Sequence, residues 1–340
     1  MRNHNKVNER IKYLDIAKFI GIFCIYLGHF GSQAGYAYKF VFCFHVPLFF
    51  FLSGCSENFS KDINLKKYII KNLKKIILPF FIFSILSVIF NCIYSNSING
   101  LTNSLLIILK GCIRNTFFAG SLWFLTCLFI IKIMFYIFRK IIKNKYLIIL
   151  TCLLLYVFTG FIINTSPLVN PRMFFNIDSA FYYIIYYALG YYSLNIIHSI
   201  LSWDCKFKIN FSIILGLLSS IYTFMLFFDK NIFNFLNSIK YLCFLPDLLC
   251  PIVVIILIIL ISKLLENNDF FSNIGENTLY LCGSEYFIKL LIPICLEIFG
   301  LSLYLSNPIA TYIYTFILLI VCNRYLVPLE KQLFKRLHII

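Results

Sequence analysis

Residues 13–30 read YLDIAKFIGIFCIYLGHF, an apolar run interrupted by the ionisable side chains of Asp15, Lys18 and His29. The run is long enough to cross the hydrocarbon core of a bilayer as a helix. Eleven helical steps separate Lys18 from His29, which places both on one face about 16 Å apart along the axis. Ionisable side chains are costly in lipid, so two on one stripe indicate a functional site. We expect Asp15, three residues before Lys18, to form an ion pair with it.

Similar apolar runs recur along the whole chain. Hydrophobic residues make up 61% of the 340 residues, charged residues make up 13%, and the mean hydropathy is +0.86. No segment is left that could bury the core of a separate soluble domain. We predict an all-α, polytopic integral membrane protein with about ten transmembrane helices. They are expected at 13–33, 38–55, 76–95, 121–138, 146–164, 177–197, 209–228, 241–265, 274–299 and 308–327.

The charge pattern predicts the orientation of this domain. Lysine and arginine gather before the first run, between the second and third, and between the fourth and fifth, which are segments on one side of the membrane. By the positive-inside rule, both termini are cytoplasmic. We therefore divide the chain into a cytoplasmic tail at 1–12, a membrane domain at 13–327 and a basic cytoplasmic tail at 328–340. The net charge of +16 then reflects topology and not nucleic-acid binding. The 13 cysteines show no metal-ligand spacing, so we expect no metal.

The second run carries another histidine. His45 and His29 are equally distant from Ala37, so an antiparallel hairpin places the two imidazoles level in the outer half of the membrane. Two structural readings remain open. Membrane histidines also form hydrogen bonds between helices, and Lys18 with Asp15 can be an anchoring ion pair near the inner interface.

Other candidates carry weaker signals. Trp123 falls where an interface belt of aromatic residues is expected, so we interpret it as an anchor. Glu285 and Lys289 are four residues apart and are expected to pair within one helix. Arg114 lies in the outer segment 96–120, which is apolar but too short to cross and is predicted to roof an outward-facing cavity. Three carboxylates near predicted helix ends are expected to stay hydrated: Asp178, Asp247 and Glu276.

Several of these stretches resemble the acyltransferase-3 family of membrane acyltransferases. Residues 10–29 resemble its opening, in which a basic residue, ten further residues and a histidine recur; here these are Lys18 and His29. Residues 44–54, FHVPLFFFLSG, resemble its second motif, and residues 121–125, SLWFL, its Trp-Phe-Leu stretch. The closest subgroup in appearance is similar to fucose 4-O-acetylases. Many members place a histidine after a stretch resembling 274–281, where this chain offers Glu285 as a substitute.

The resemblance implies transfer of an acyl group, expected to be acetyl, from cytoplasmic acyl-CoA to a hydroxyl of an envelope polysaccharide or lipid-linked sugar. It also implies a multi-pass protein of the bacterial inner membrane, with room for a separate partner that relays acyl groups. His29 would act as general base or accept the acyl group, and His45 would orient it, stabilise the oxyanion or act as a second base. Lys18, held by Asp15, would bind a CoA phosphate. Weaker candidates for substrate binding are Ser53, Trp123, Arg114 and Glu285.

Two other classes of function remain open. A transporter or flippase of a lipid-linked saccharide would also use many helices with buried charges. Such a carrier should show two pseudo-symmetric halves with interrupted helices, and the sequence shows no internal repeat. A purely structural membrane scaffold would tolerate replacement of His29.

Overall fold

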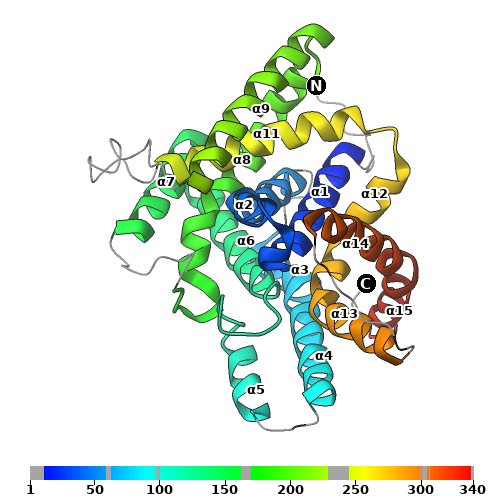
Figure 1. Cartoon of the computed structure of the whole chain (residues 1–340). Helices are drawn as coiled ribbons and strands as arrows, with labels where there is room; N and C mark the ends of the chain where they lie inside the picture. Colours follow the sequence, from blue (N-terminus) through cyan, green and yellow to red (C-terminus); the bar gives the residue numbers. More distant parts are fainter. Residues whose placement is uncertain are drawn as a thin grey trace.

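The computed structural model describes residues 11–58, 63–95, 97, 100–161, 170–228, 245–298, 300, 305 and 307–337. All regular structure in these ranges is helical, so the predicted all-α class is confirmed. Most of the predicted N-terminal tail, residues 1–10, and the last residues, 338–340, lie outside the described part. The helices in chain order (Figure 1) are α1 Lys12–Gly28, η1 Gly31–Ala34, α2 Ala37–Glu57, α3 Leu65–Asn72, η2 Leu73–Ile77, α4 Leu78–Ser95, α5 Leu101–Leu109, α6 Trp123–Ile141, α7 Lys145–Phe161, η3 Phe174–Asn176, α8 Ile177–Leu201, α9 Cys205–Phe228, α11 Leu245–Leu264, α12 Asp269–Glu276, α13 Thr278–Ile298, α14 Pro308–Val321, η4 Cys322–Leu326 and α15 Val327–Arg336.

Each of the ten predicted apolar runs overlaps one of these helices, although residues 162–164, 241–244 and 299 at the ends of three runs lie outside the described residues. Six helical segments are long and apolar enough to cross a membrane, counting only what the structure describes. The count of ten spans and the cytoplasmic side of the termini stay predictions. The six segments are Ala37–Glu57, Leu65–Ser95, Phe174–Leu201, Asp247–Leu264, Thr278–Glu297 and Pro308–Arg336.

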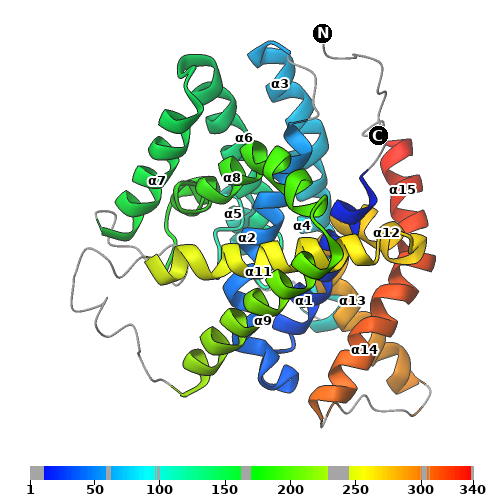
Figure 2. The same ribbon diagram turned by 90° about the horizontal axis from the view of Figure 1, so that it is seen from above.

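The hairpin of α1 and α2 forms the centre of the fold, as Figures 1 and 2 show. Gly31 and Gly35 have positive φ angles of 59° and 57°, so they make the sharp turn that L side chains resist. One side of α2 packs against α8, with α6 and α7 beyond it. Helices α11 and α9 cover another side, and α12, α13 and α14 pack against α1. Most side chains of α1 and of the second half of α2 are therefore buried within the protein.

Two glycines allow the close crossing of α2 and α8. A Cβ atom at Gly54 would lie 2.1 Å from the carbonyl oxygen of Tyr187, and one at Gly190 would lie 2.0 Å from that of Phe51. Membrane helices use small residues to bring their backbones into contact, because dispersion and weak polar contacts replace the hydrophobic effect in lipid. This contact sets how deeply α2 sits in the bundle.

We expect Gly190→Ala to destabilise the protein. The added methyl meets backbone on the facing helix, so the helices must separate, at a cost of about 3 kcal/mol in the free energy of unfolding. Gly216→Ala is the matched control, because a Cβ there has no atom within 4 Å. It should stabilise α9 by about 0.5–1 kcal/mol through helix propensity alone. Denaturant titration in mixed micelles measures both; equal effects of the two variants would contradict the crossing.

The segment after α5 packs against the helix bundle and does not lie wholly on its surface. The backbone N–H of Phe175 donates to the carbonyl of Lys110 at 2.9 Å, and the Asn176 side-chain amide donates to the carbonyl of Gly111 at 3.0 Å. These bonds direct the following residues toward the end of α1. Residues 96, 98 and 99 of the predicted roof lie outside the described residues.

The interpretation of Asp178 as a hydrated carboxylate is wrong. Its side chain is fully buried, and one carboxylate oxygen accepts hydrogen bonds from the backbone N–H groups of Arg172 at 2.7 Å and Met173 at 3.1 Å. The other oxygen accepts from the Ser179 N–H at 2.8 Å. A carboxylate can replace its water with such donors at the start of a helix, and here it shapes the turn that leads into α8.

Candidate active site

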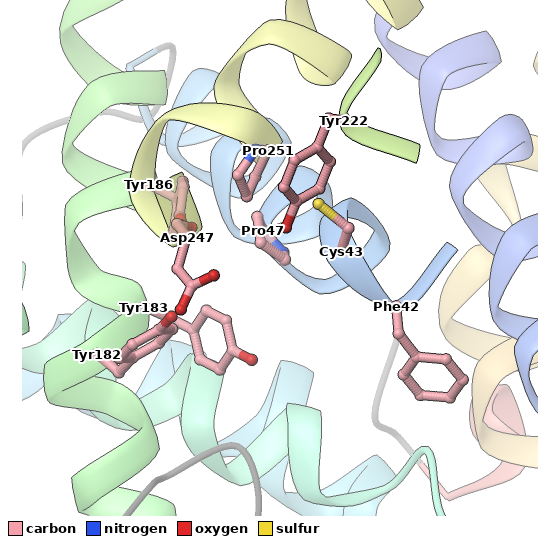
Figure 3. Close-up of a pocket in the computed structure, with 9 residues that line it drawn as sticks. All are labelled: Phe42, Cys43, Pro47, Tyr182, Tyr183, Tyr186, Tyr222, Asp247 and Pro251. Atoms are coloured by element: carbon pink, nitrogen blue, oxygen red, sulfur yellow. The ribbon is translucent and has the colours of Figure 1, made fainter. Parts of the chain in front are cut away.

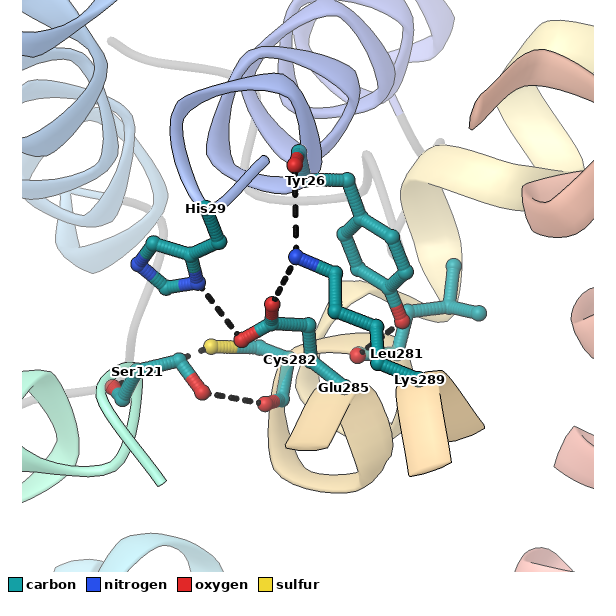
Figure 4. Close-up of polar contacts among 7 residues, drawn as sticks. All are labelled: Tyr26, His29, Ser121, Leu281, Cys282, Glu285 and Lys289. Atoms are coloured by element: carbon teal, nitrogen blue, oxygen red, sulfur yellow. Dashed lines mark hydrogen bonds and ion pairs between the residues drawn. The ribbon is translucent and has the colours of Figure 1, made fainter. Parts of the chain in front are cut away.

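His29 stands at the C-terminal end of α1, where its backbone N–H still donates to the carbonyl of Ile25 at 3.1 Å. Its ring points away from α1 toward α13, and Nδ1 lies 2.7 Å from Oε2 of Glu285 (Figure 4). The Glu285 side chain is 3% exposed and that of His29 is 24% exposed. The imidazole is therefore held against a buried carboxylate from a distant part of the chain.

The same carboxylate also binds a cation. Oε1 of Glu285 lies 2.7 Å from Nζ of Lys289, so the predicted pair within one helix is confirmed. The ammonium also donates to the Tyr26 carbonyl at 3.4 Å and lies 4.3 Å from the centre of the Phe30 ring. Lys289 thus balances the negative charge that Glu285 brings into an apolar surrounding.

This arrangement sets the tautomer of His29. A carboxylate only accepts hydrogen bonds, so in the neutral imidazole Nδ1 carries the hydrogen and Nε2 carries the free lone pair. No described residue bonds to Nε2. Gly120 is the neighbour on that side, since a Cβ atom built on it would lie 3.9 Å from Nε2. Nε2 can therefore accept a proton from a group placed beside it.

Two further hydrogen bonds tie α13 to its neighbours around this pair. The Ser121 hydroxyl donates to the Cys282 carbonyl at 2.8 Å, and the Tyr26 hydroxyl donates to the Leu281 carbonyl at 2.7 Å (Figure 4). Both acceptors lie within one helical turn of Glu285. Sequence reasoning missed this role of Ser121, although the residue opens the SLWFL stretch that was singled out.

A cavity of about 140 Å³ lies on the Lys18 side of this pair, among α1, α2, η2, α6 and α13. Lys18 and Ser53 are its polar lining residues on α1 and α2, and most of the remaining wall is apolar. Its wall includes Ile25, four residues before His29, and Cys282, three residues before Glu285. The cavity therefore extends from Lys18 to within one helical turn of the His29–Glu285 pair.

Asp15 lies behind this cavity and not in its wall. Its carboxylate is 3.0 Å from Nζ of Lys18, and the Asp15 side chain is 3% exposed while that of Lys18 is 24% exposed. The predicted ion pair is confirmed. Asp15 holds the ammonium of Lys18 in place, and Lys18 is the member that faces the cavity.

His45 does not bond to His29. It is 3% exposed, and its Nδ1 donates to the Val41 carbonyl of the same helix at 2.5 Å. In the structure Glu285, and not His45, is the group that orients the His29 ring.

Trp123 is buried, so its interpretation as an interface anchor is wrong. It is 6% exposed, and the Arg114 guanidinium lies 4.8 Å from its ring centre. Arg114 also donates to the Tyr183 hydroxyl at 3.1 Å, and the Trp123 and Tyr183 rings are 6.0 Å apart. Arg114 therefore packs against two aromatic side chains.

Metal ligands do not gather in the described ranges, where no three His, Cys, Asp or Glu side chains come together. Another buried ion pair was missed: Lys132 on α6 binds Glu57 on α2 and contacts the Tyr187 hydroxyl at 3.4 Å. An unpaired lysine inside a predicted apolar run was the signal for it, but nothing in the sequence points to Glu57 as its partner.

These features define a multi-pass helical membrane protein in which a buried carboxylate orients the His29 imidazole near an apolar cavity. The acyltransferase-3 family model, an acyltransferase domain, matches residues 11–326. The chain therefore belongs to the acyltransferase-3 family and is a membrane acyltransferase. No curated protein and no solved structure matches it. The fucose 4-O-acetylase-like subgroup stays a prediction.

Proposed function

We propose that this acyltransferase moves an acetyl group from cytoplasmic acyl-CoA to a hydroxyl of a cell-envelope sugar, polymeric or lipid-linked, in the bacterial inner membrane. The observation that carries the proposal is the 2.7 Å contact between His29 Nδ1 and the Glu285 carboxylate, which leaves Nε2 as a free base. A base, an orienting carboxylate and a nearby cavity are parts that acyl transfer can use.

The chemical step follows from this geometry. Nε2 of His29 takes the proton of the acceptor hydroxyl while the oxygen attacks the thioester carbonyl carbon. The tetrahedral intermediate collapses, the C–S bond breaks, and the ester forms. The imidazolium then returns its proton to the departing thiolate, which leaves as the free thiol of CoA. Glu285 stabilises the imidazolium between these two transfers, as carboxylates paired with catalytic histidines do.

The cavity supplies the path for the donor. Its apolar wall suits the pantetheine arm, and Lys18 at its inner end offers a point charge to a CoA phosphate. Ser53 adds a hydroxyl at the same end. Asp15 keeps the Lys18 ammonium directed, so its contribution passes through Lys18.

We expect Lys18→Gln to raise KM for acetyl-CoA about tenfold or more while kcat changes little, because a hydrogen-bonded charge contact is lost far from the reacting atoms. Lys12→Gln is the matched control. Its ammonium pairs with Asp269 at 2.6 Å, and both side chains are mostly exposed. Initial rates of CoA thiol release, read against acetyl-CoA concentration, give both constants. An unchanged KM in the Lys18 variant would show that the donor does not use this cavity.

The reaction itself is tested with acetyl-CoA labelled in the acetyl group. Purified protein in vesicles, supplied with envelope extract, should transfer the label to carbohydrate and release one CoA thiol for each acetyl group transferred. A transporter or flippase would move a lipid-linked saccharide across the vesicle membrane and leave the thioester intact. That second result would reject the transferase in favour of the carrier.

A further inference from the structure

A second pocket lies on a different face of α2 from the donor cavity and shares no lining residue with it. It measures about 80 Å³ and is formed by α2, α8, α9 and α11 (Figure 3). Four phenol side chains and one carboxylate, that of Asp247, line it together with Phe42, Cys43 and two prolines. The tyrosines are Tyr182, Tyr183, Tyr186 and Tyr222.

Asp247 is the charged group of this pocket. Figure 3 shows its carboxylate projecting toward Tyr182 and Tyr183, with Tyr222 on another wall. No described residue forms an ion pair with this carboxylate or donates a hydrogen bond to it. The residue is instead held through its backbone, whose carbonyl accepts from the Tyr186 hydroxyl at 3.0 Å. Asp247 is exposed, so water or a ligand can supply the donors that the described residues do not.

Two of the tyrosine hydroxyls can donate a hydrogen bond to a hydroxyl group of a ligand. The Tyr183 hydroxyl accepts from Arg114 at 3.1 Å, and the Tyr182 hydroxyl accepts from the Tyr156 hydroxyl at 3.2 Å. An acceptor bond of this kind leaves the phenol proton available for another partner. The rings of Tyr182 and Tyr183 meet edge to face, with centroids 5.0 Å apart, and give the pocket rigid apolar surface.

We infer that this pocket is the acceptor subsite and that it takes a neutral sugar ring. Vicinal hydroxyls of such a ring donate to Asp247, and the phenol groups accept from or donate to the others. The C–H faces of the ring pack on aromatic surface. An anionic sugar is disfavoured by Asp247, and an isolated metal ion is disfavoured because a single described carboxylate lines the pocket. This inference rests on the proposed function.

The pocket connects to the catalytic histidine through short contacts. Phe42 of its wall packs edge to face on His45, with ring centroids 5.0 Å apart. Tyr183 is hydrogen-bonded to Arg114, whose guanidinium covers Trp123 at the start of α6. Trp123 follows Gly120, the neighbour of His29 Nε2, by three residues. A saccharide longer than one ring can thus occupy the pocket while another of its hydroxyls reaches His29.

The test uses the fluorescence of Trp123. The chain has two tryptophans, so Trp203→Phe leaves Trp123 as the single reporter, 6.0 Å from the Tyr183 ring. This variant, in vesicles free of sugar detergents, is titrated with L-fucose, D-glucose, D-galactose, N-acetylglucosamine, D-glucuronate and choline chloride. We expect at least one neutral sugar to give a saturable signal and glucuronate to bind more weakly. Asp247→Asn should raise the Kd of that sugar about tenfold, since it removes hydrogen bonds to a charged acceptor.

Asp269→Asn is the matched control, because this carboxylate is 80% exposed in its side chain, pairs with Lys12 and lies outside the pocket. It should leave the Kd unchanged. Saturable binding of choline or glucuronate without binding of any neutral sugar would overturn the inference, and so would a sugar Kd that Asp247→Asn does not alter. Failure of the proposed function is a separate result: it appears as absence of thioester consumption, whereas failure of this subsite leaves acetyl-CoA turnover that depends on His29.

Discussion

We expect His29→Gln to lower kcat for acyl transfer by about 10²–10⁴-fold, because a positioned general base contributes a rate factor of this size. Glutamine keeps a polar group of similar reach but cannot take up the hydroxyl proton. KM for acetyl-CoA should change little, because the Lys18 end of the cavity is untouched. The measurement is transfer of labelled acetyl to envelope carbohydrate, normalised to the amount of folded protein in the membrane.

His198→Gln provides the comparison for this variant. His198 is an exposed residue of the last turn of α8, remote from the His29–Glu285 pair, so its loss should leave transfer at the level of the unaltered protein. If His29→Gln protein is present at normal levels and still transfers acetyl at the full rate, His29 is not the base. The structural scaffold would then be the better description.

Glu285→Gln is expected to reduce kcat by about 10²-fold or more. The amide oxygen can still accept a hydrogen bond from His29 Nδ1, but the negative charge that stabilises the imidazolium is gone. Lys289 also loses its counter-charge, which adds a cost to the folded state. Initial rates over a range of acetyl-CoA concentrations separate the effect on kcat from the effect on KM.

A positioning role for Glu285 also predicts the effects of its variants on KM and on recovery of kcat. KM for acetyl-CoA should stay within about twofold, since no donor contact is removed. Glu285→Asp should recover part of the lost kcat by restoring the charge on a shorter arm. Glu297→Gln, an exposed position near the far end of the same helix, is the control and should have no effect. Equal losses in the Gln and Asp variants would indicate that Glu285 serves only packing.

The proposed donor cavity and the tyrosine-lined pocket share no lining residue. One cavity has a mostly apolar wall that includes Lys18, and the other has phenols with a single described carboxylate. These linings suit different chemistries, a long thiol arm that ends in phosphates and a ring covered with hydroxyls. In the proposed function, this separation keeps each substrate at its own site until the acyl group passes.

Contacts within one helix were predictable because helical spacing alone determines them. The Asp15–Lys18 and Glu285–Lys289 pairs are three and four residues apart, and both form as expected. The apolar runs likewise predicted the helices. The prediction that failed was the placement of Trp123 at the membrane interface, because a tryptophan at the end of an apolar run fits either a membrane interface or a bundle interior. The neighbour that decides this, Arg114, comes from another element.

By itself the sequence determined the helical segments, the ion pairs along single helices, and the family through its Lys18 to His29 spacing. Only the tertiary structure decided that Glu285, 256 residues away, holds His29, and that the tyrosines of α8 face Asp247. The physical reason is that membrane helices are apolar on most faces, so their pattern does not specify rotation about the axis. Backbone contacts such as Gly54 against Tyr187 set that rotation, and they exist only once the helices have packed.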